Sequence, residues 1–158
     1  MFMFGMNTGL RIGDILKVKV QEVRGRDILI LQEQKTGKIR RAVINAELKA
    51  LLNEFTACRD PGEYLFKSRQ GSNKPISRVR AYQVLTDAAR AVGLDEIGTH
   101  TLRKTMGYWH YQRNKDIAML QNLLNHSSPA DTLRYIGISD EMAENSMRNF
   151  SMFQDEGI

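Results

Sequence analysis

Apolar residues recur every three or four positions in several stretches of the chain, which is the spacing of one face of an α-helix. One stretch starts after Asn45, a residue type that caps helix N-termini, and runs from Leu48 to Phe55. Another starts after Ser77 and ends at Gly93, a common helix stop. Further helices are predicted at Thr99–Arg113, Asp116–Leu124, Pro129–Tyr135 and Asp140–Phe153, the last capped by Ser139.

The segment from position 18 to position 44 carries β-prone residues around two turn sequences. These turns are RGRD at residues 24–27 and KTGK at residues 35–38. Such a segment predicts a three-stranded antiparallel sheet with Lys35 at the tip of its second hairpin. Together with the helices, it predicts an α+β, mainly α-helical fold, in which a small three-stranded antiparallel sheet packs beside a helical bundle.

The length of 158 residues is enough for one substantial core, so we expect a single domain over residues 1–158. The opening letters MFMFGMNTGL are typical of the end of a buried helix, which favours a fragment whose N-terminal domain is absent. No run approaches the roughly 18 apolar residues of a membrane span. Cys58 is the only cysteine, so an internal disulfide is excluded and a reducing, cytoplasmic location is expected.

Five short segments carry side chains that are able to bind phosphate, and the charge balance is compatible with such a partner. The 23 Lys and Arg residues exceed the 18 Asp and Glu residues, and the net charge of +5 allows a polyanionic partner without requiring one. The segments are TGLR with Arg11, QKTGK with Lys35, HTLR with His100 and Arg103, LLNHSS with His126, and TLRYIG with Tyr135. Each residue alone has an ordinary explanation, such as a surface cation, a histidine at a helix end or a core tyrosine. Their joint occurrence favours one shared site.

The order and wording of these segments resemble the catalytic domain of the tyrosine recombinase (phage integrase) family. NTGLRIGDIL resembles the first arginine box, HTLRKT the His-x-x-Arg box, LLNHSSPADTLRYIGIS the box with the nucleophile, and QKTGK the turn that bears the lysine. The resemblance implies the fold of that C-terminal catalytic domain and the absence of an N-terminal DNA-binding domain. Asp14 stands where the family more often has Glu, and we expect its carboxylate to orient Arg11.

The resemblance implies site-specific recombination or integration of DNA, with strand cleavage and rejoining through a 3′-phosphotyrosyl intermediate. The catalytic residues that it implies are Tyr135 as nucleophile, Arg11 and Arg103 as the arginine pair, Lys35 as general acid, and His100 and His126. Which histidine takes the tyrosyl proton and which donates to the phosphate stays open. No metal or cofactor is expected, because two permanently charged arginines can stabilise the phosphate oxygens.

Double-stranded DNA is the expected partner. The candidates for contacts to its phosphate backbone are Lys74, Arg78, Arg80, Lys38, Arg40 and Arg41. The amphipathic C-terminal segment 139–153 has two possible roles, which are packing on its own domain and self-association on DNA.

Three alternative functions are compatible with parts of this pattern. A DNA-binding module of the same fold would not cleave, and a type IB topoisomerase-like strand transferase would share the chemistry. A metal-dependent hydrolase would use His100, His110 and His126, but these lack a ligand spacing such as His-Glu-x-x-His.

Overall fold

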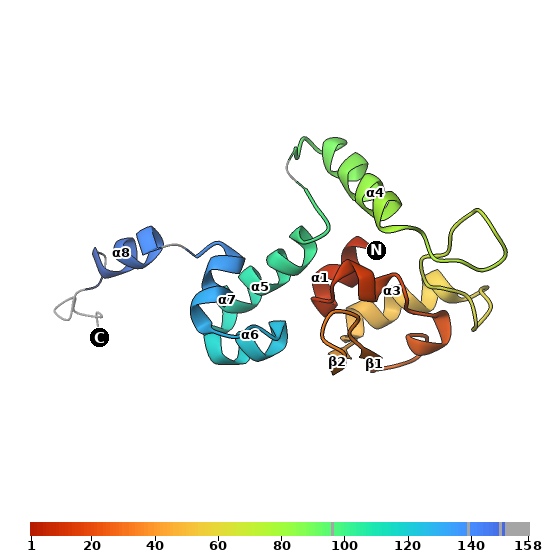
Figure 1. Ribbon diagram of the computed structural model, residues 1–158, viewed down its shortest axis with the longest axis horizontal. Coiled ribbons are helices and arrows are strands. Elements are labelled where there is room, and N and C mark those ends of the chain that lie inside the picture. Colours follow the sequence, from red (N-terminus) through yellow and green to blue (C-terminus); the bar gives the residue numbers. More distant parts are fainter. Residues whose placement is uncertain (96, 139, 149, 151–158) are drawn as a thin grey trace, which may run out of the picture.

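The computed structural model describes residues 1–95, 97–138, 140–148 and 150. It has the α+β, mainly α-helical fold that the sequence predicts (Figure 1). The elements are α1 (Phe2–Thr8), α2 (Ile12–Ile15), η1 (Val20–Glu22), β1 (Ile28–Gln32), β2 (Ile39–Val43), α3 (Ala46–Thr56), α4 (Arg78–Arg90), α5 (Thr101–Asn114), α6 (Ile117–Leu124), α7 (Pro129–Ile136) and α8 (Asp140–Arg148). Across the described residues, no helix is both long and apolar enough to cross a membrane.

The helix caps form as the sequence predicts. The Asn45 side chain accepts a hydrogen bond from the Leu48 N–H at the start of α3. Ser77 accepts one from the Arg80 N–H at the start of α4. Each bond satisfies a backbone donor that has no partner inside its helix. Gly9 ends α1 in the left-handed conformation, with a φ of 61° that glycine adopts without a Cβ clash.

The sheet contains two antiparallel strands in the described part of the chain, where three were predicted. Residues 18–23, predicted as the first strand, instead contain the 3₁₀ helix η1 and one isolated bridge from Lys19 to Tyr64. The Glu22 carboxylate accepts a hydrogen bond from the Lys19 backbone N–H at 2.6 Å. The Val20 and Gln21 N–H groups donate to the Glu63 and Pro61 carbonyls, so this segment does not pair with β1.

A first hydrophobic core joins α1, α2, the β1–β2 hairpin and α3. Its members are fully or almost fully removed from solvent, and they are spread along the chain from Phe4 to Leu65. They are Phe4, Leu10, Ile15, Val18, Val23, Leu29, Ala42, Ile44, Leu48, Leu52 and Leu65. This core therefore fixes α2 relative to the hairpin.

A second core joins α5, α6 and α7 around Leu120, Leu124 and Ile136. Gly107 allows α5 and α7 to approach closely, because a Cβ at this position would lie 2.8 Å from Ile136 Cγ2. The two cores meet where α1 packs on α5. A Cβ on Gly5 would lie 2.6 Å from Leu102 Cδ1, so this junction is also tightly packed.

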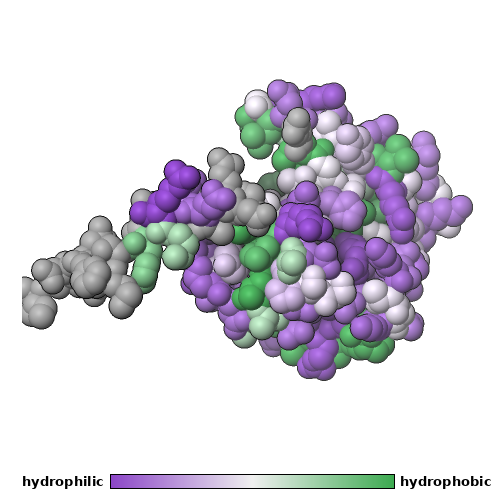
Figure 2. All heavy atoms as spheres, turned by 60° about the vertical axis from the view of Figure 1, so that its left-hand side comes forward, coloured by the Kyte–Doolittle hydropathy of each residue, from purple (hydrophilic) through white to green (hydrophobic). Residues whose placement is uncertain are grey.

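Helix α8 stands away from the rest of the molecule (Figures 1 and 2). Met142 and Met147 are exposed on it, and Figure 2 shows paler or apolar residues along one side and polar residues along the other. The predicted cap Ser139 and residues 149 and 151–153 of the last predicted helix lie outside the described residues.

Candidate active site

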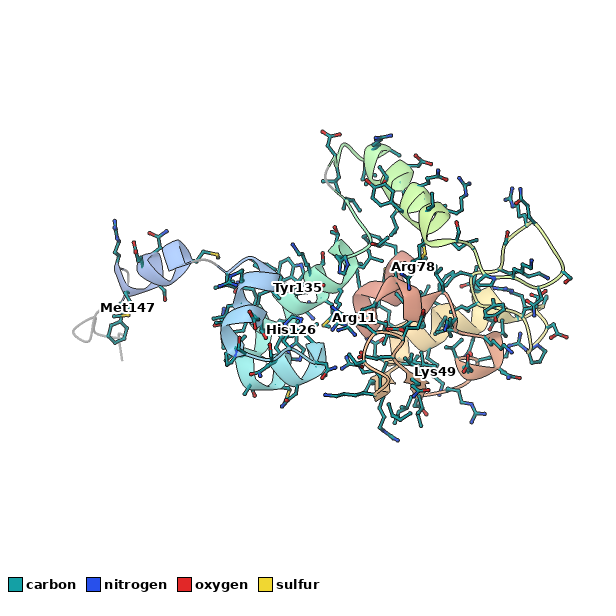
Figure 3. The ribbon with its side chains drawn as sticks, viewed as in Figure 1. Arg11, Lys49, Arg78, His126, Tyr135 and Met147 are labelled. Atoms are coloured by element: carbon teal, nitrogen blue, oxygen red, sulfur yellow. The ribbon has the colours of Figure 1, made fainter. Side chains whose placement is uncertain are left out.

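One pocket of about 390 Å³ is lined by all six residues that the sequence singles out for phosphate chemistry. It lies between the two cores, and Figure 3 shows Arg11 on one side with His126 and Tyr135 on the other. We call the side formed by α5, α6 and α7, with Arg103, His126 and Tyr135, the helical wall. The side formed by α2 and the β1–β2 turn, with Arg11 and Lys35, is the hairpin wall. The fold thus brings together residues more than 100 positions apart.

Arg103 on the helical wall is a buried cation, with only 2% of the residue exposed. Its guanidinium donates to the Gly9 carbonyl at the end of α1 and to the Leu124 carbonyl at the end of α6. Arginine has five N–H donors in a rigid fork, so donors remain for a ligand. Burial, and next the charge of Arg11, lower the pKa of Arg103 to about 10. The group is therefore still positively charged at neutral pH.

Arg11 on the hairpin wall is held by a glutamate that the sequence interpretation missed. The NH1 atom of Arg11 lies 3.0 Å from Glu33 Oε2. The contact is an ion pair without the alignment of a hydrogen bond. The expectation that Asp14 orients Arg11 is wrong, because Asp14 Oδ1 accepts a hydrogen bond from the Gln34 backbone N–H at 2.9 Å instead. Asp14 therefore fixes the β1–β2 turn, and Glu33 fixes Arg11.

Lys35 lies in the β1–β2 turn, as predicted, and its side chain is exposed. The turn is closed by hydrogen bonds from the Gly37 N–H to the Glu33 carbonyl and from the Glu33 N–H to the Lys38 carbonyl, both 2.9 Å. Within the described structure, the Lys35 ammonium makes no hydrogen bond or ion pair with another side chain. The backbone of the turn is fixed while the lysine side chain remains available to a ligand.

His126 follows Asn125, the residue that ends α6, and its ring packs against Thr132. Thr132 Oγ1 donates to the Ser128 carbonyl at 2.9 Å and lies 3.2 Å from His126 Nδ1. A hydroxyl has one hydrogen, so this arrangement places the proton of the neutral ring on Nδ1 and leaves Nε2 as an acceptor. Burial, followed by the charges of Arg103 and Arg11, lowers the pKa of His126. The neutral ring is therefore favoured.

Tyr135 on α7 places a buried hydroxyl at the pocket. Among the described residues its oxygen has no hydrogen-bond partner, and Arg103 lies near it without an aligned bond. The His126 and Tyr135 rings meet edge to face, with centroids 4.9 Å apart. Burial raises the pKa of Tyr135, and the charges of Arg103 and Arg11 partly offset this. The phenol is therefore protonated at neutral pH and needs a base to become a strong nucleophile.

His100 lines the pocket from the residue that precedes α5. It is exposed and makes no side-chain capping bond, whereas Arg103 three residues later is buried. The predicted juxtaposition of the two residues at one helix end is therefore observed, with the histidine at the rim and the arginine at the base.

The cations predicted on β2 point in different directions. Lys38 is exposed at the end of the turn, and its Nζ donates to Asn125 Oδ1 at 3.3 Å. Side chains alternate along a strand, so Arg41 faces solvent while Arg40 is half-buried on the face towards the core. Burial lowers the pKa of Arg40, and Glu33 opposes that effect. Arg40 therefore belongs electrostatically to the pocket, while Arg41 is placed for an external contact.

The cations around the start of α4 lie outside the pocket. Lys74 and Arg80 line a separate groove with a volume of about 840 Å³. Arg78, labelled in Figure 3, donates from its NH2 atom to Gln34 Oε1 at 3.4 Å, next to the turn that carries Lys35. Of these three cations, only Arg78 therefore lies beside the β1–β2 turn, while Lys74 and Arg80 belong to the separate groove.

A metal centre built from the three histidines is not observed. In residues 1–95, 97–138, 140–148 and 150, no three His, Cys, Asp or Glu side chains gather as metal ligands would.

Sequence reasoning missed Glu33, Asn125 and Thr132, which support the pocket residues. Glu33 did leave a signal. Side chains alternate along a strand, so the core-facing side of β1 takes every second residue, namely Leu29, Leu31 and then Glu33. A carboxylate therefore follows two apolar residues onto a buried face. A charged residue at such a position needs a partner, and that requirement could have been stated in advance.

Known proteins with a similar sequence or fold carry family names that agree with this geometry. The phage integrase family model matches residues 1–142. YoeC of Bacillus subtilis (strain 168), a probable integrase/recombinase, is 51% identical over 150 residues, which are 95% of this chain and 82% of YoeC. The tyrosine recombinase XerA of Pyrococcus furiosus is 24% identical, over 94% of this chain and 52% of its own length.

Solved structures show the same fold. The crystal structure of XerA recombinase aligns with a TM-score of 0.71 at 20% identity, covering 93% of this chain and 56% of that one. A lambda integrase dimer bound to a core site aligns with a TM-score of 0.65 at 18% identity. The alignment covers 87% of this chain and 50% of the lambda integrase chain. Apart from YoeC, this chain thus spans about half the length of these relatives. The chain belongs to the phage integrase family of tyrosine recombinases.

Proposed function

We propose that this domain is the catalytic unit of a site-specific DNA recombinase, which cleaves and rejoins DNA strands through a tyrosine. The observation that carries the proposal is the pocket itself. A tyrosine hydroxyl without a partner among the described residues shares it with two arginines, two histidines and a lysine from separate segments. That set contains each group that a transesterification at phosphorus needs.

In the proposed step, the Tyr135 oxygen attacks the scissile phosphate of a DNA strand. The bond from the tyrosine oxygen to phosphorus forms while the bond from phosphorus to the 5′ oxygen breaks. The products are a 3′-phosphotyrosyl link and a free 5′-hydroxyl. Because one phosphodiester replaces another, the free energy of the cleaved phosphodiester bond is conserved in the phosphotyrosyl link. Attack by a second 5′-hydroxyl therefore reverses the step without a nucleotide cofactor.

Arg11 and Arg103 would stabilise the charge on the nonbridging phosphate oxygens. Each guanidinium has donors that are not used by its protein partners, which are Glu33 for Arg11 and two backbone carbonyls for Arg103. These partners fix both forks before a ligand arrives. Charged donors held in place in this way lower the barrier without reorganising during the reaction.

Proton transfer would use groups on both walls. The pKa of Tyr135 is raised, so its proton needs an acceptor, and neutral His126 offers Nε2. His100 at the rim would then contact a nonbridging oxygen. The departing 5′ oxygen needs a proton, which Lys35 would supply from the exposed turn. This assignment sharpens the choice between the histidines that the sequence leaves open.

DNA would lie across the pocket and contact the exposed cations around it. Arg41 and Lys38 on the hairpin and Lys74, Arg78 and Arg80 near α4 are candidates for backbone contacts. The family supports this placement, since XerH and lambda integrase appear among the structural relatives as DNA complexes. Segment 139–153, which includes α8 with its exposed Met142 and Met147, would mediate self-association on DNA.

A covalent-trapping assay tests the proposal. Duplexes with a nick and a randomised central segment are incubated with protein and EDTA, and adducts are separated on a denaturing gel. A nick beside the scissile phosphate lets the 5′-hydroxyl fragment diffuse away, so the intermediate accumulates. We expect an adduct with the wild type that Tyr135→Phe abolishes. Tyr111→Phe is the matched control, because Tyr111 packs on the same second core without lining the pocket.

The remaining outcomes contradict the proposal. An adduct that persists in Tyr135→Phe refutes the nucleophile. DNA binding without any adduct favours the non-cleaving module. An adduct accompanied by relaxation of supercoiled DNA, without strand transfer between two duplexes, favours the topoisomerase-like alternative.

A further inference from the structure

Glu33 is a carboxylate directly behind a pocket in which Arg11, Arg103 and Lys35 are suited to bind an anion. Only 2% of the residue is exposed. Although burial raises its pKa, the Thr36 hydroxyl and Arg11 outweigh that effect and lower the pKa of Glu33 below its usual range. It is therefore ionised at neutral pH. A negative charge beside a phosphate site weakens phosphate binding, so its presence requires another explanation.

The contacts of Glu33 join three separate segments around the pocket. Oε2 lies 3.0 Å from Arg11 NH1 at the start of α2. The same oxygen accepts a hydrogen bond from Thr36 Oγ1 in the turn at 2.8 Å, and a longer one from Asn125 Nδ2 at 3.4 Å. Asn125 in turn accepts from Lys38 Nζ at 3.3 Å. One buried side chain thus ties both walls together next to His126.

The backbone of Glu33 contributes a second set of contacts. Its carbonyl accepts from the Gly37 N–H and its N–H donates to the Lys38 carbonyl, so the residue forms the base of the turn. Asp14 holds the neighbouring Gln34 N–H from the α2 side. Lys35 therefore lies between two anchored residues, one bound by Asp14 and the other, Thr36, bound by Glu33.

The charge of Glu33 also offsets repulsion within the pocket. The charge of Arg11 lowers the pKa of both Arg103 and Arg40, and the charge of Arg40 also lowers the pKa of Arg103. Glu33 opposes that repulsion for both Arg103 and Arg40. Without an internal anion, three cations would face one another in the absence of a ligand, which favours displacement of the most mobile of them.

We propose that Glu33 is a positioning residue that holds the Lys35 turn and the Arg11 fork in their reactive arrangement before DNA binds. This inference rests on the proposed function for its catalytic consequence, while its structural part stands without it. Glu33 is not among the residues that line the pocket, and its side-chain contacts are to Arg11, Thr36 and Asn125. It acts through Arg11, Thr36 and Asn125, at the cost of weaker attraction for the phosphate.

Glu33→Gln is the decisive variant, because it keeps the shape and one acceptor oxygen but removes the charge. Glu63→Gln is the matched control, since Glu63 pairs with Arg59 and Lys67 away from the pocket. Hydrogen exchange of the Gln34–Lys38 amides is measured on DNA-free protein. We expect exchange in the turn to be about tenfold faster in Glu33→Gln and unchanged in the control.

The same variant separates DNA binding from cleavage. Removal of a negative charge from a basic surface strengthens or preserves binding to a random duplex, measured by fluorescence anisotropy. The rate of adduct formation should nevertheless fall about tenfold to a hundredfold, because the lysine and arginine are misplaced. Tighter binding combined with slower cleavage is the signature of positioning, and a merely structural role would reduce both.

Several results would overturn the inference. Unchanged exchange in the turn does so directly, as does a parallel loss of binding and cleavage. If Glu33→Gln does not fold, Thr36→Val at an exposed position removes the contact to Glu33 together with the acceptor of the Lys38 N–H. Exchange is then compared at the Gln34, Lys35 and Gly37 amides, where an unchanged rate has the same meaning. A wild type that forms no adduct counts against the proposed function, and the exchange experiment still decides whether Glu33 holds the turn.

Discussion

The two walls of the pocket are built by different means. On the helical wall, Arg103 is bonded to backbone carbonyls of α1 and α6, and Tyr135 packs against the second core. On the hairpin wall, Arg11 is held by one carboxylate and Lys35 is exposed. Figure 3 shows the two sides facing each other across the junction of the cores.

This difference separates groups whose positions are fixed by backbone contacts from a lysine whose side chain has no such contact in the described structure. Backbone carbonyls belong to helices, so the position of Arg103 changes only if helices shift. A lysine in a short turn can enter or leave the pocket when a few dihedrals change. We infer that Arg103 stabilises charge from the rigid wall and Lys35 delivers a proton from the adjustable one, so substitutions of these two residues should differ in their effects on stability.

Arg103→Lys should produce the largest loss of stability. Lysine cannot reproduce the fork that bonds the Gly9 and Leu124 carbonyls, so at least one buried acceptor loses its partner. We expect the free energy of unfolding to fall by about 2–3 kcal/mol. Urea denaturation measures it, with Arg134→Lys on exposed α7 surface as the control, expected within about 0.5 kcal/mol of wild type. Equal effects in both variants would contradict the contrast between the walls.

Gly107→Ala should disturb the helical wall from the side of the second core, at a residue that does not itself line the pocket. The added Cβ would lie 2.8 Å from Ile136 Cγ2, and Ile136 is buried and β-branched, so α7 must shift. Overpacking costs about 1–3 kcal/mol, while alanine favours the helix by about 1 kcal/mol. The net loss should be about 1 kcal/mol in thermal or urea unfolding. Gly98→Ala, where nothing lies within 4 Å of the new Cβ, should show no such loss.

Thr132→Val should change the protonation of His126 more than the stability of the fold. Valine keeps the shape of threonine but cannot accept from Nδ1, so the proton should move to Nε2. We expect a loss of about 1 kcal/mol. Nitrogen-15 NMR of the imidazole identifies the protonated nitrogen directly. A wild type already protonated on Nε2 would refute the proton-acceptor role given to His126.

The fold class was predictable because it depends on local periodicity. The apolar spacing from Leu48 to Phe55 involves only a few adjacent residues, and so do the caps at Asn45 and Ser77. Helices α3 and α4 form as predicted. The strand predicted over residues 18–23 failed for the opposite reason. Its Val20 and Gln21 N–H groups donate to the carbonyls of Glu63 and Pro61, which are distant in sequence and which a propensity argument does not weigh.

The pocket was predictable in its members and less so in its supports. The residue types around Arg11, Arg103 and Tyr135 indicate their chemistry, and all line one pocket. Their partners depend on pairs distant in sequence, such as Arg103 with the Gly9 carbonyl, and backbone carbonyls carry no sequence signal at all. The expectation that Asp14 orients Arg11 came from its place in the arginine box, and it failed because the fold directs the Asp14 carboxylate to the Gln34 N–H.

The pH dependence of stability should reflect His126 on the helical wall. Its pKa is lowered in the folded state by burial and then by Arg103 and Arg11, with Asp131 opposing. A lowered folded pKa favours the neutral ring, so this contribution is complete above the unfolded value of about 6.5 and is lost as pH falls below it. Unfolding free energies of wild type and His126→Gln should therefore converge as pH decreases. An NMR titration of His126 above about 6.5 would contradict this sign.

Lys35→Ala should have the smallest effect on stability and a large one on cleavage. The side chain is exposed and makes no ion pair or hydrogen bond in the described structure, so the free energy of unfolding should change by less than about 0.5 kcal/mol. If Lys35 protonates the leaving oxygen, adduct formation should fall by about a hundredfold.

A duplex with sulfur in place of the bridging 5′ oxygen tests the reason for that loss. A thiolate leaves without a proton, since thiols are far more acidic than alcohols. This substrate should restore the rate of Lys35→Ala and leave Arg103→Lys slow, because charge on the nonbridging oxygens still needs the rigid fork. Rescue of both variants, or of neither, would contradict the assignment of charge stabilisation to Arg103 and of leaving-group protonation to Lys35.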